Sequence, residues 1–98
     1  MGSSLKSAHF LVESRLRDAA RGDTNACYDL GVVYSSGAEG MNIDLIEAHK
    51  WFNLAAMSGD ERAKDCRAEI SEDMSAREII EAQKAARAWL ISTQARAA

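Results

Sequence analysis

The sequence predicts an all-α protein, and three observations lead to that prediction. The 98 residues contain no proline, 47% are apolar, and alanine-rich stretches with few β-branched residues favour helices over strands. Apolar residues recur at alternating spacings of three and four, which is the period of one helix face. Glycines and capping side chains divide these stretches into five segments. We therefore expect one small domain of about five helices and no sheet.

The first two expected helices cover residues 4–20 and 24–35. Gly22 ends the first helix, because glycine readily adopts the left-handed conformation found at helix ends, and Asp23 caps the second. Both helices carry an apolar stripe on the side expected to face the core. In the first helix the stripe comprises Leu5, Ala8, Val12, Leu16 and Ala19, widened by Phe10 and Leu11, and in the second it comprises Ala26, Leu30, Val33 and Tyr34.

Gly31 lies in the middle of the second expected helix. A glycine there costs about 1 kcal/mol relative to alanine, so a packing contact must offset the loss. The missing Cβ lets a partner helix approach closely. We expect Ala48 and Phe52 of the third helix to pack against Gly31.

Capping residues place the three remaining helices. Asp44 with Glu47, and Ser75 with Glu78, have the spacing of a capping box and start the third and fifth helices. Asp60 caps the fourth helix, expected over 61–72. The expected inner faces are Leu45, Ala48, Trp51, Phe52, Ala55 and Ala56 in the third helix, Ala63, Cys66 and Ile70 in the fourth, and Ile79, Ala82, Ala86 and Leu90 in the fifth, which runs to about Thr93. Trp51 is expected in the core, with an anchor for a partner as the alternative.

One pattern occurs twice, 37 residues apart. The string Ala-x-x-Gly-Asp-x-x-Ala spans residues 19–26 and 56–63. Both copies fall at a junction between two expected helices. A period of this length predicts a helical repeat protein.

Residues 22–64 resemble a Sel-one-like repeat, a long-loop relative of the tetratricopeptide repeats. The resemblance implies a short α/α solenoid of antiparallel helix hairpins within a single domain, 1–98: a partial repeat helix over 4–20, a complete repeat over 24–58 and a degenerate capping hairpin over 60–93. The matching residues are Ala26, Leu30, Gly31, Tyr34, Gly37, Asp44, Ala48, Trp51, Phe52, Ala55, Ala56, Gly59 and Ala63. In the closing unit Arg67 and Ala68 replace the Leu-Gly pair of the repeat, which favours a capping role with a more polar outer face.

The residues that could carry chemistry form no recognised pattern. His9 and His49 lie on different helices, and no metal-ligand spacing joins them to the cysteines. Cys27 and Cys66 are expected to be two reduced thiols, as in a cytoplasmic protein. A cysteine–histidine nucleophile pair is the catalytic alternative, but nothing in the sequence would lower the pKa of either thiol. We expect no enzyme, no cofactor and no metal.

Charge and hydropathy exclude two classes of partner. Residues 1–74 carry eight basic and thirteen acidic side chains, and residues 75–98 carry four and two. Neither part forms a basic footprint for nucleic acid. The apolar runs are far shorter than the roughly 20 residues that cross a membrane. We expect no nucleic acid and no membrane as partners, and a cytoplasmic location.

The candidate binding surface lies on the second and fourth helices. Tyr28 is off the apolar stripe, and the first helix of each repeat lines the concave surface in such arrays. We expect Tyr28 to be an aromatic anchor whose removal weakens binding and hardly changes stability. The candidate protein-binding residues are Asn25, Tyr28, Asp29, Val32, Arg62, Asp65 and Glu69.

The function that these features predict is a non-catalytic adaptor, bacterial in style, that binds a peptide or protein of unknown identity through the concave helical face. Three alternatives stay open. The patch is ordinary solvated surface, the binding surface is the loop over residues 36–43, or the chain is a structural unit that forms homo-oligomers such as a homodimer by end-to-end helix packing.

Overall fold

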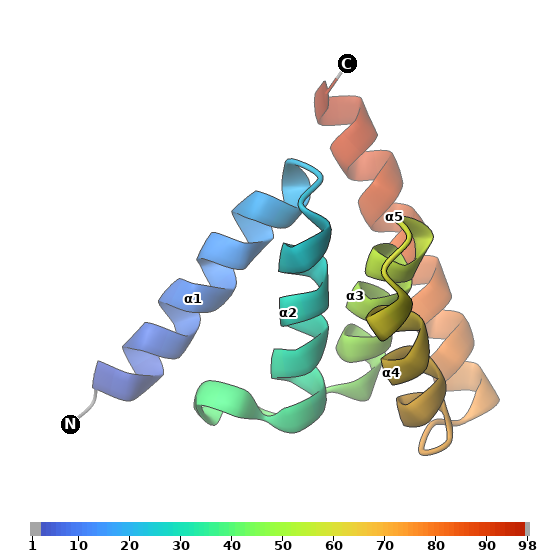
Figure 1. The fold of residues 1–98 in the computed structure, drawn as a ribbon, viewed down its shortest axis with the longest axis horizontal. Helices are drawn as coiled ribbons and strands as arrows, with labels where there is room; N and C mark the ends of the chain where they lie inside the picture. Colours follow the sequence, from blue (N-terminus) through green and yellow to red (C-terminus); the bar gives the residue numbers. More distant parts are fainter. Residues whose placement is uncertain (1–2, 98) are drawn as a thin grey trace.

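The structure, a computed structural model, describes residues 3–97 and is built of helices (Figure 1). Within that range there are five α-helices and no strand, which confirms the predicted all-α fold. Four expected helix ranges agree within a residue or two, whereas the fifth helix continues beyond Thr93. The helices are α1 (Ser3–Ala20), α2 (Thr24–Ser36), α3 (Leu45–Met57), α4 (Glu61–Ser71) and α5 (Ala76–Ala97), with a 3₁₀ turn, η1 (Ala38–Gly40), after α2.

The helix α3 is the centre of the arrangement. It packs against α2, α4 and α5, and α1 packs chiefly against α2 and η1. Figure 1 shows successive helices running in alternating directions, with α1 and α2 meeting at one end and diverging toward the start of α1. The backbones of α4 and α5 share few contacts with each other. The segment 60–93, expected as a closing hairpin, therefore consists of two helices that each pack chiefly on α3.

The two copies of the repeated pattern form the same junction. Gly22 and Gly59 are left-handed, with φ of 93° and 97°. In each copy the glycine N–H donates to the carbonyl three residues back, and the following aspartate N–H donates to the carbonyl five residues back, at 3.0 and 3.1 Å. This is the Schellman arrangement. Asp23 and Asp60 then each accept a hydrogen bond from the first turn of the next helix, so one aspartate closes one helix and caps the next.

The two expected capping boxes differ. Ser75 and Glu78 exchange hydrogen bonds in both directions, at 3.1 and 2.8 Å. Asp44 accepts from the Glu47 N–H at 3.1 Å, but the Glu47 carboxylate instead accepts from Trp51 Nε1 at 2.9 Å. The backbone N–H of Asp44, which Glu47 leaves free, donates to the carbonyl of Tyr34 at 2.9 Å. The start of α3 is therefore tied to the end of α2.

The largest fully buried side chains are Trp51, Phe52 and Leu30, as expected of the core. A Cβ built on Gly31 would lie 2.5 Å from Cδ1 of Phe52, a distance that real Cβ atoms do not show. The expected contact between Gly31 and Phe52 is confirmed. Phe10 was expected to widen the core face of the first helix, but it is 67% exposed. That expectation is wrong: Val12, two residues further on, is buried, and a step of two residues turns the helix by about 200°, so Phe10 lies on the opposite side of α1.

His49 gives the fold a pH dependence. It is 2% exposed, and its Nδ1 has no hydrogen-bond partner among the described residues. Burial, and secondly the charge of Arg67, lower its pKa below the usual 6.5. His49 therefore binds a proton more readily in the unfolded chain than in the folded chain. We expect the free energy of unfolding to fall as the pH drops below about 6.5. Urea unfolding between pH 5 and pH 8 measures this slope.

The matched comparison is His49→Leu against His9→Gln, which changes an exposed histidine. Carboxylates such as Asp60, whose pKa is lowered chiefly by the hydrogen bond from Arg62, also lose stabilising charge in acid. The difference between parent and His49→Leu isolates the histidine. A slope unchanged by His49→Leu would contradict the assignment, and His9→Gln is expected to leave it intact.

Candidate binding groove between α2 and α4

Three of the expected site residues form one cluster at the start of α2 and α4. The Arg62 guanidinium lies over the Tyr28 ring, 4.0 Å from its centroid. Its Nη2 donates to Asn25 Oδ1 at 3.1 Å and to Asp60 Oδ2 at 2.8 Å. The hydrogen bond from Arg62 is the main reason why the pKa of Asp60 is lowered. Arg62 therefore joins the first turns of the two helices, and its charge is already paired.

A half-open hollow of about 270 Å³ lies between α2 and α4, over α3. Its apolar walls come from Val32, Phe52 and Ile70, and Cys66 lies beside them. We call this hollow the α2/α4 groove. It is lined by Val32, Ser35, Phe52, Cys66, Glu69, Ile70 and Asp73.

The charged residues of the groove are acidic. Glu69 is exposed on α4, and Asp73 is exposed in the turn that follows this helix, and both line the groove. None of the ion pairs between described residues involves either carboxylate. The groove therefore combines an apolar interior with unpaired negative charge at its edge.

Two other expected site residues lie outside the groove. Asp29 accepts a hydrogen bond from Arg15 Nε at 3.0 Å, which joins α2 to α1 instead of α4. Asp65 is exposed on α4 and is not among the groove residues. Val32 and Glu69 line the groove, whereas Asn25, Tyr28 and Arg62 make the cluster described above.

Tyr28 packs more deeply than its position in the sequence indicates. Its ring lies 5.9 Å from that of Phe52, and the side chain is half-buried against the core. Burial is the largest cause that raises its pKa. The expectation that its removal hardly changes stability needs correction, because replacing Tyr28 would remove core contacts as well as any contact with a partner.

Sequence reasoning missed Ser35 and Asp73, and it assigned Cys66 and Ile70 to an inner helix face alone. Helical spacing could have found Ser35, because steps of four and three from Tyr28 reach Val32 and Ser35. It could not have found Asp73, which lies in the turn after α4. Residues at the edge of an inner face line the groove because α2 and α4 touch each other at few points.

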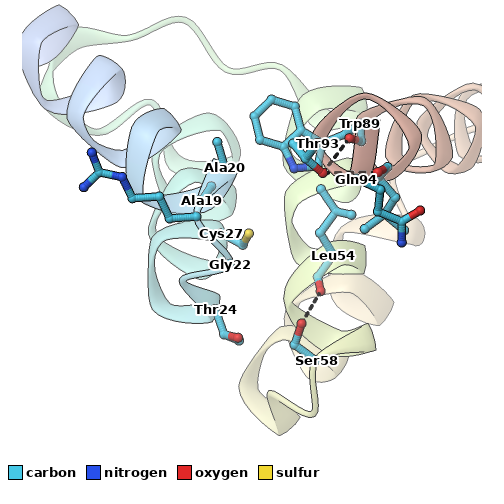
Figure 2. Close-up of a pocket in the computed structure, with 12 residues that line it drawn as sticks. Ala19, Ala20, Gly22, Thr24, Cys27, Leu54, Ser58, Trp89, Thr93 and Gln94 are labelled. Carbon is cyan, nitrogen blue, oxygen red and sulfur yellow. Dashed lines mark hydrogen bonds between the residues drawn. The ribbon is translucent and has the colours of Figure 1, made fainter. Parts of the chain in front are cut away.

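A second hollow, of about 250 Å³, lies between the α1–α2 corner and the helices α3 and α5 (Figure 2). Cys27 points toward it, but burial, and secondly Asp23, raise the pKa of this thiol to about 11, so it stays protonated at neutral pH. The hydroxyls of Ser58 and Thr93 donate to carbonyls of their own helices, Leu54 at 3.4 Å and Trp89 at 3.0 Å. This hollow therefore offers no thiolate at neutral pH, and its other polar lining residues are Arg21, Thr24 and Gln94.

The described part of the chain shows neither a metal site nor a membrane span. Within it, no three histidine, cysteine, aspartate or glutamate side chains gather where they could hold a metal ion. None of the helices found there has the length and apolar character needed to cross a membrane. Cys27 is buried and Cys66 half-buried, and each is a free thiol.

Fold and groove together define a small all-α protein with a half-open, acid-edged apolar hollow. Comparison of the chain with models of known families, with curated proteins and with solved structures finds no match.

Proposed function

We propose that the chain is a non-catalytic interaction module that binds a peptide segment of a partner protein in the α2/α4 groove. The observation that supports the proposal is the combination of an apolar interior and a polar edge in one half-open hollow. Apolar side chains of the peptide would contact Val32 and Ile70 and supply affinity, while polar groups at the edge would fix the register.

We also propose that the helices are a short α/α solenoid of the Sel-one-like type. The identical hydrogen bonds at the two junctions, 37 residues apart, support this proposal. The close approach of Phe52 to Gly31 supports it as well, because it explains why a glycine stands at a repeat position inside a helix. Two free thiols suit a reducing compartment such as the cytoplasm.

The groove is tested with a random peptide library displayed on phage and selected on the parent protein. Selected peptides are then titrated by calorimetry against Ser35→Arg and Ala68→Arg. Ser35 lines the groove and Ala68 is exposed on α4 outside it. Because the new arginine would fill the hollow, we expect Ser35→Arg to weaken binding by about tenfold or more, and Ala68→Arg to leave it unchanged.

Both variants are first checked by urea unfolding, so that loss of binding is not mistaken for loss of folding. Peptides that bind Ser35→Arg as well as the parent would move the binding surface elsewhere, to the loop over residues 36–43 in the first instance. Failure to select any peptide would contradict the proposed function.

A further inference from the structure

The helix α5 has an outer face that stays exposed among the described residues. Arg77, Ile80, Lys84, Arg87 and Ile91 follow one another at spacings of three and four, so they form one stripe. We call these five residues the α5 stripe. Ile80 is 52% exposed and Ile91 69% exposed. Over fourteen residues at about 1.5 Å each, the stripe is about 21 Å long.

The α5 stripe is both basic and apolar. Its three charged members are all cations, and their methylene stems extend the apolar surface between the two isoleucines. Arg77, Ile80, Glu81 and Lys84 line a shallow depression on this face, so one carboxylate lies beside the cations of the stripe. An exposed isoleucine contributes little to the stability of a helix, because the helix restricts its χ1 freedom. A contact that covers its side chain would therefore be stabilising.

The α2/α4 groove has the complementary properties. It has an apolar interior between Val32 and Ile70, and the unpaired carboxylates Glu69 and Asp73 at its edge. The charge difference extends beyond these side chains, because residues 1–74 are net acidic and residues 75–98 net basic. A basic helix with exposed isoleucines therefore matches this groove in both charge and hydropathy.

The stripe cannot fill the groove of its own molecule. The inner face of α5, with Ala82 and Ala86, is buried, and α5 packs on α3. The outer face therefore points away from α3, whereas the groove opens between α2 and α4. Any contact between the two surfaces joins two molecules.

We propose that the α5 stripe of one molecule docks in the α2/α4 groove of a second copy of this chain. An isoleucine of the stripe enters the hollow between Val32 and Ile70, and Lys84 and Arg87 face Glu69 and Asp73. The proposal rests on the proposed function in one respect, that the groove is a binding surface. Because the two surfaces differ, the contact is head-to-tail. Each molecule that joins still has a free stripe or a free groove, so further copies can bind until one of these surfaces is blocked.

The test measures the mass of the full chain by sedimentation velocity over a range of concentrations. The parent is expected to rise above its 10.7 kDa monomer mass. Ser35→Arg blocks the groove and keeps the stripe, whereas the double variant Lys84→Glu/Arg87→Glu reverses the stripe and keeps the groove. Each is expected to associate about tenfold or more weakly than the parent.

The decisive sample is an equimolar mixture of these two variants. One intact stripe meets one intact groove, so the mixture is expected to form a one-to-one pair and to grow no further. The control Arg17→Glu/Lys64→Glu makes the same change of net charge at exposed positions outside both surfaces, and it is expected to associate as the parent does. Raising the salt concentration is expected to weaken association, because it screens the exposed charges.

A parent that stays monomeric at millimolar concentration would overturn the proposal, and so would Ser35→Arg associating as strongly as the parent. A mixture that stays monomeric while the parent associates would overturn it too. If the parent is monomeric yet binds library peptides that Ser35→Arg does not bind, self-docking is wrong and the proposed function stands. If no peptide is selected while the complementary mixture pairs, the groove binds its own chain and the proposed binding of other proteins is wrong.

Discussion

Gly31→Leu is expected to lower the free energy of unfolding by more than about 3 kcal/mol, beyond the usual range for an overpacked core. Even the first added atom, the Cβ, would lie 2.5 Å from Cδ1 and Cε1 of Phe52. The Phe52 side chain is 1% exposed, and the hollow beside its ring is the α2/α4 groove. Either the ring leaves the core for that groove or the helices α2 and α3 separate, and both changes remove packing at the centre of the core. Urea unfolding of the purified variant measures the loss.

The partner of the clash is tested by a double-mutant cycle. The variant Phe52→Leu lacks the ring that lies nearest to Gly31. In this background Gly31→Leu is therefore expected to lower the free energy of unfolding by less than in the parent. Gly31→Ala provides the smaller step. It is expected to be destabilising although alanine gains about 1 kcal/mol in helix propensity. An equal cost of Gly31→Leu in both backgrounds would show that Phe52 is not what excludes a side chain at this position.

The contact between Gly31 and Phe52 was predictable because a glycine inside a helix has one main physical explanation. A glycine inside an apolar helix needs a close neighbour, and the facing helix offered Phe52 at the matching position. The aspartates before α2 and α4 were predictable for the same reason, since a carboxylate after a glycine has a local role as a cap. Local chemistry of this kind does not depend on how distant helices are arranged.

Features that depend on helix arrangement were not predictable in the same way. Glu47 has the spacing of a capping box, but its carboxylate goes to Trp51 because the indole N–H of a buried ring needs an acceptor. Phe10 was assigned to the edge of a core face, but it is exposed whereas Val12, two residues further on, is buried. Trp51 lies on the same helix as Glu47, but the burial of its ring depends on tertiary packing, which periodicity alone does not specify.

The candidate site shows the same division. The pairing of α2 with α4 was expected, and it brings Asn25 and Arg62 into hydrogen-bond contact across 37 residues of sequence. Asp29 was assigned to the same face because of its place on α2, but its carboxylate pairs with Arg15 of α1 and not with a residue of α4. Sequence spacing identifies the faces of a helix, while the position of α1 decides that Asp29, the carboxylate of α2, pairs with Arg15.

Trp51→Ala is expected to lower the free energy of unfolding by about 3 to 5 kcal/mol, the range for removing a large aromatic side chain from a core. The Trp51 side chain is 1% exposed, and its ring meets Trp89 of α5 edge-on, with 4.8 Å between the centroids. Lys50 Nζ lies 4.6 Å from the centroid of Trp51 and 5.4 Å from that of Trp89. The substitution therefore removes contacts that hold α5 on α3. Chemical unfolding measures the loss of stability, and faster exchange of the backbone amide hydrogens in α5 is expected to show that this helix is loosened.

Two comparisons separate the parts of this effect. Trp51→Phe keeps an aromatic ring and loses the hydrogen bond to Glu47, so it is expected to cost less than Trp51→Ala. A cycle with Trp89→Ala is expected to show a coupling of about 0.5 to 1.5 kcal/mol between the two rings. Ile91→Ala changes a largely exposed side chain of the same helix and is expected to stay within about 0.5 kcal/mol of the parent. If Trp51→Ala were no more destabilising than Ile91→Ala, Trp51 would be a surface anchor and the packing of α5 on α3 would need another explanation.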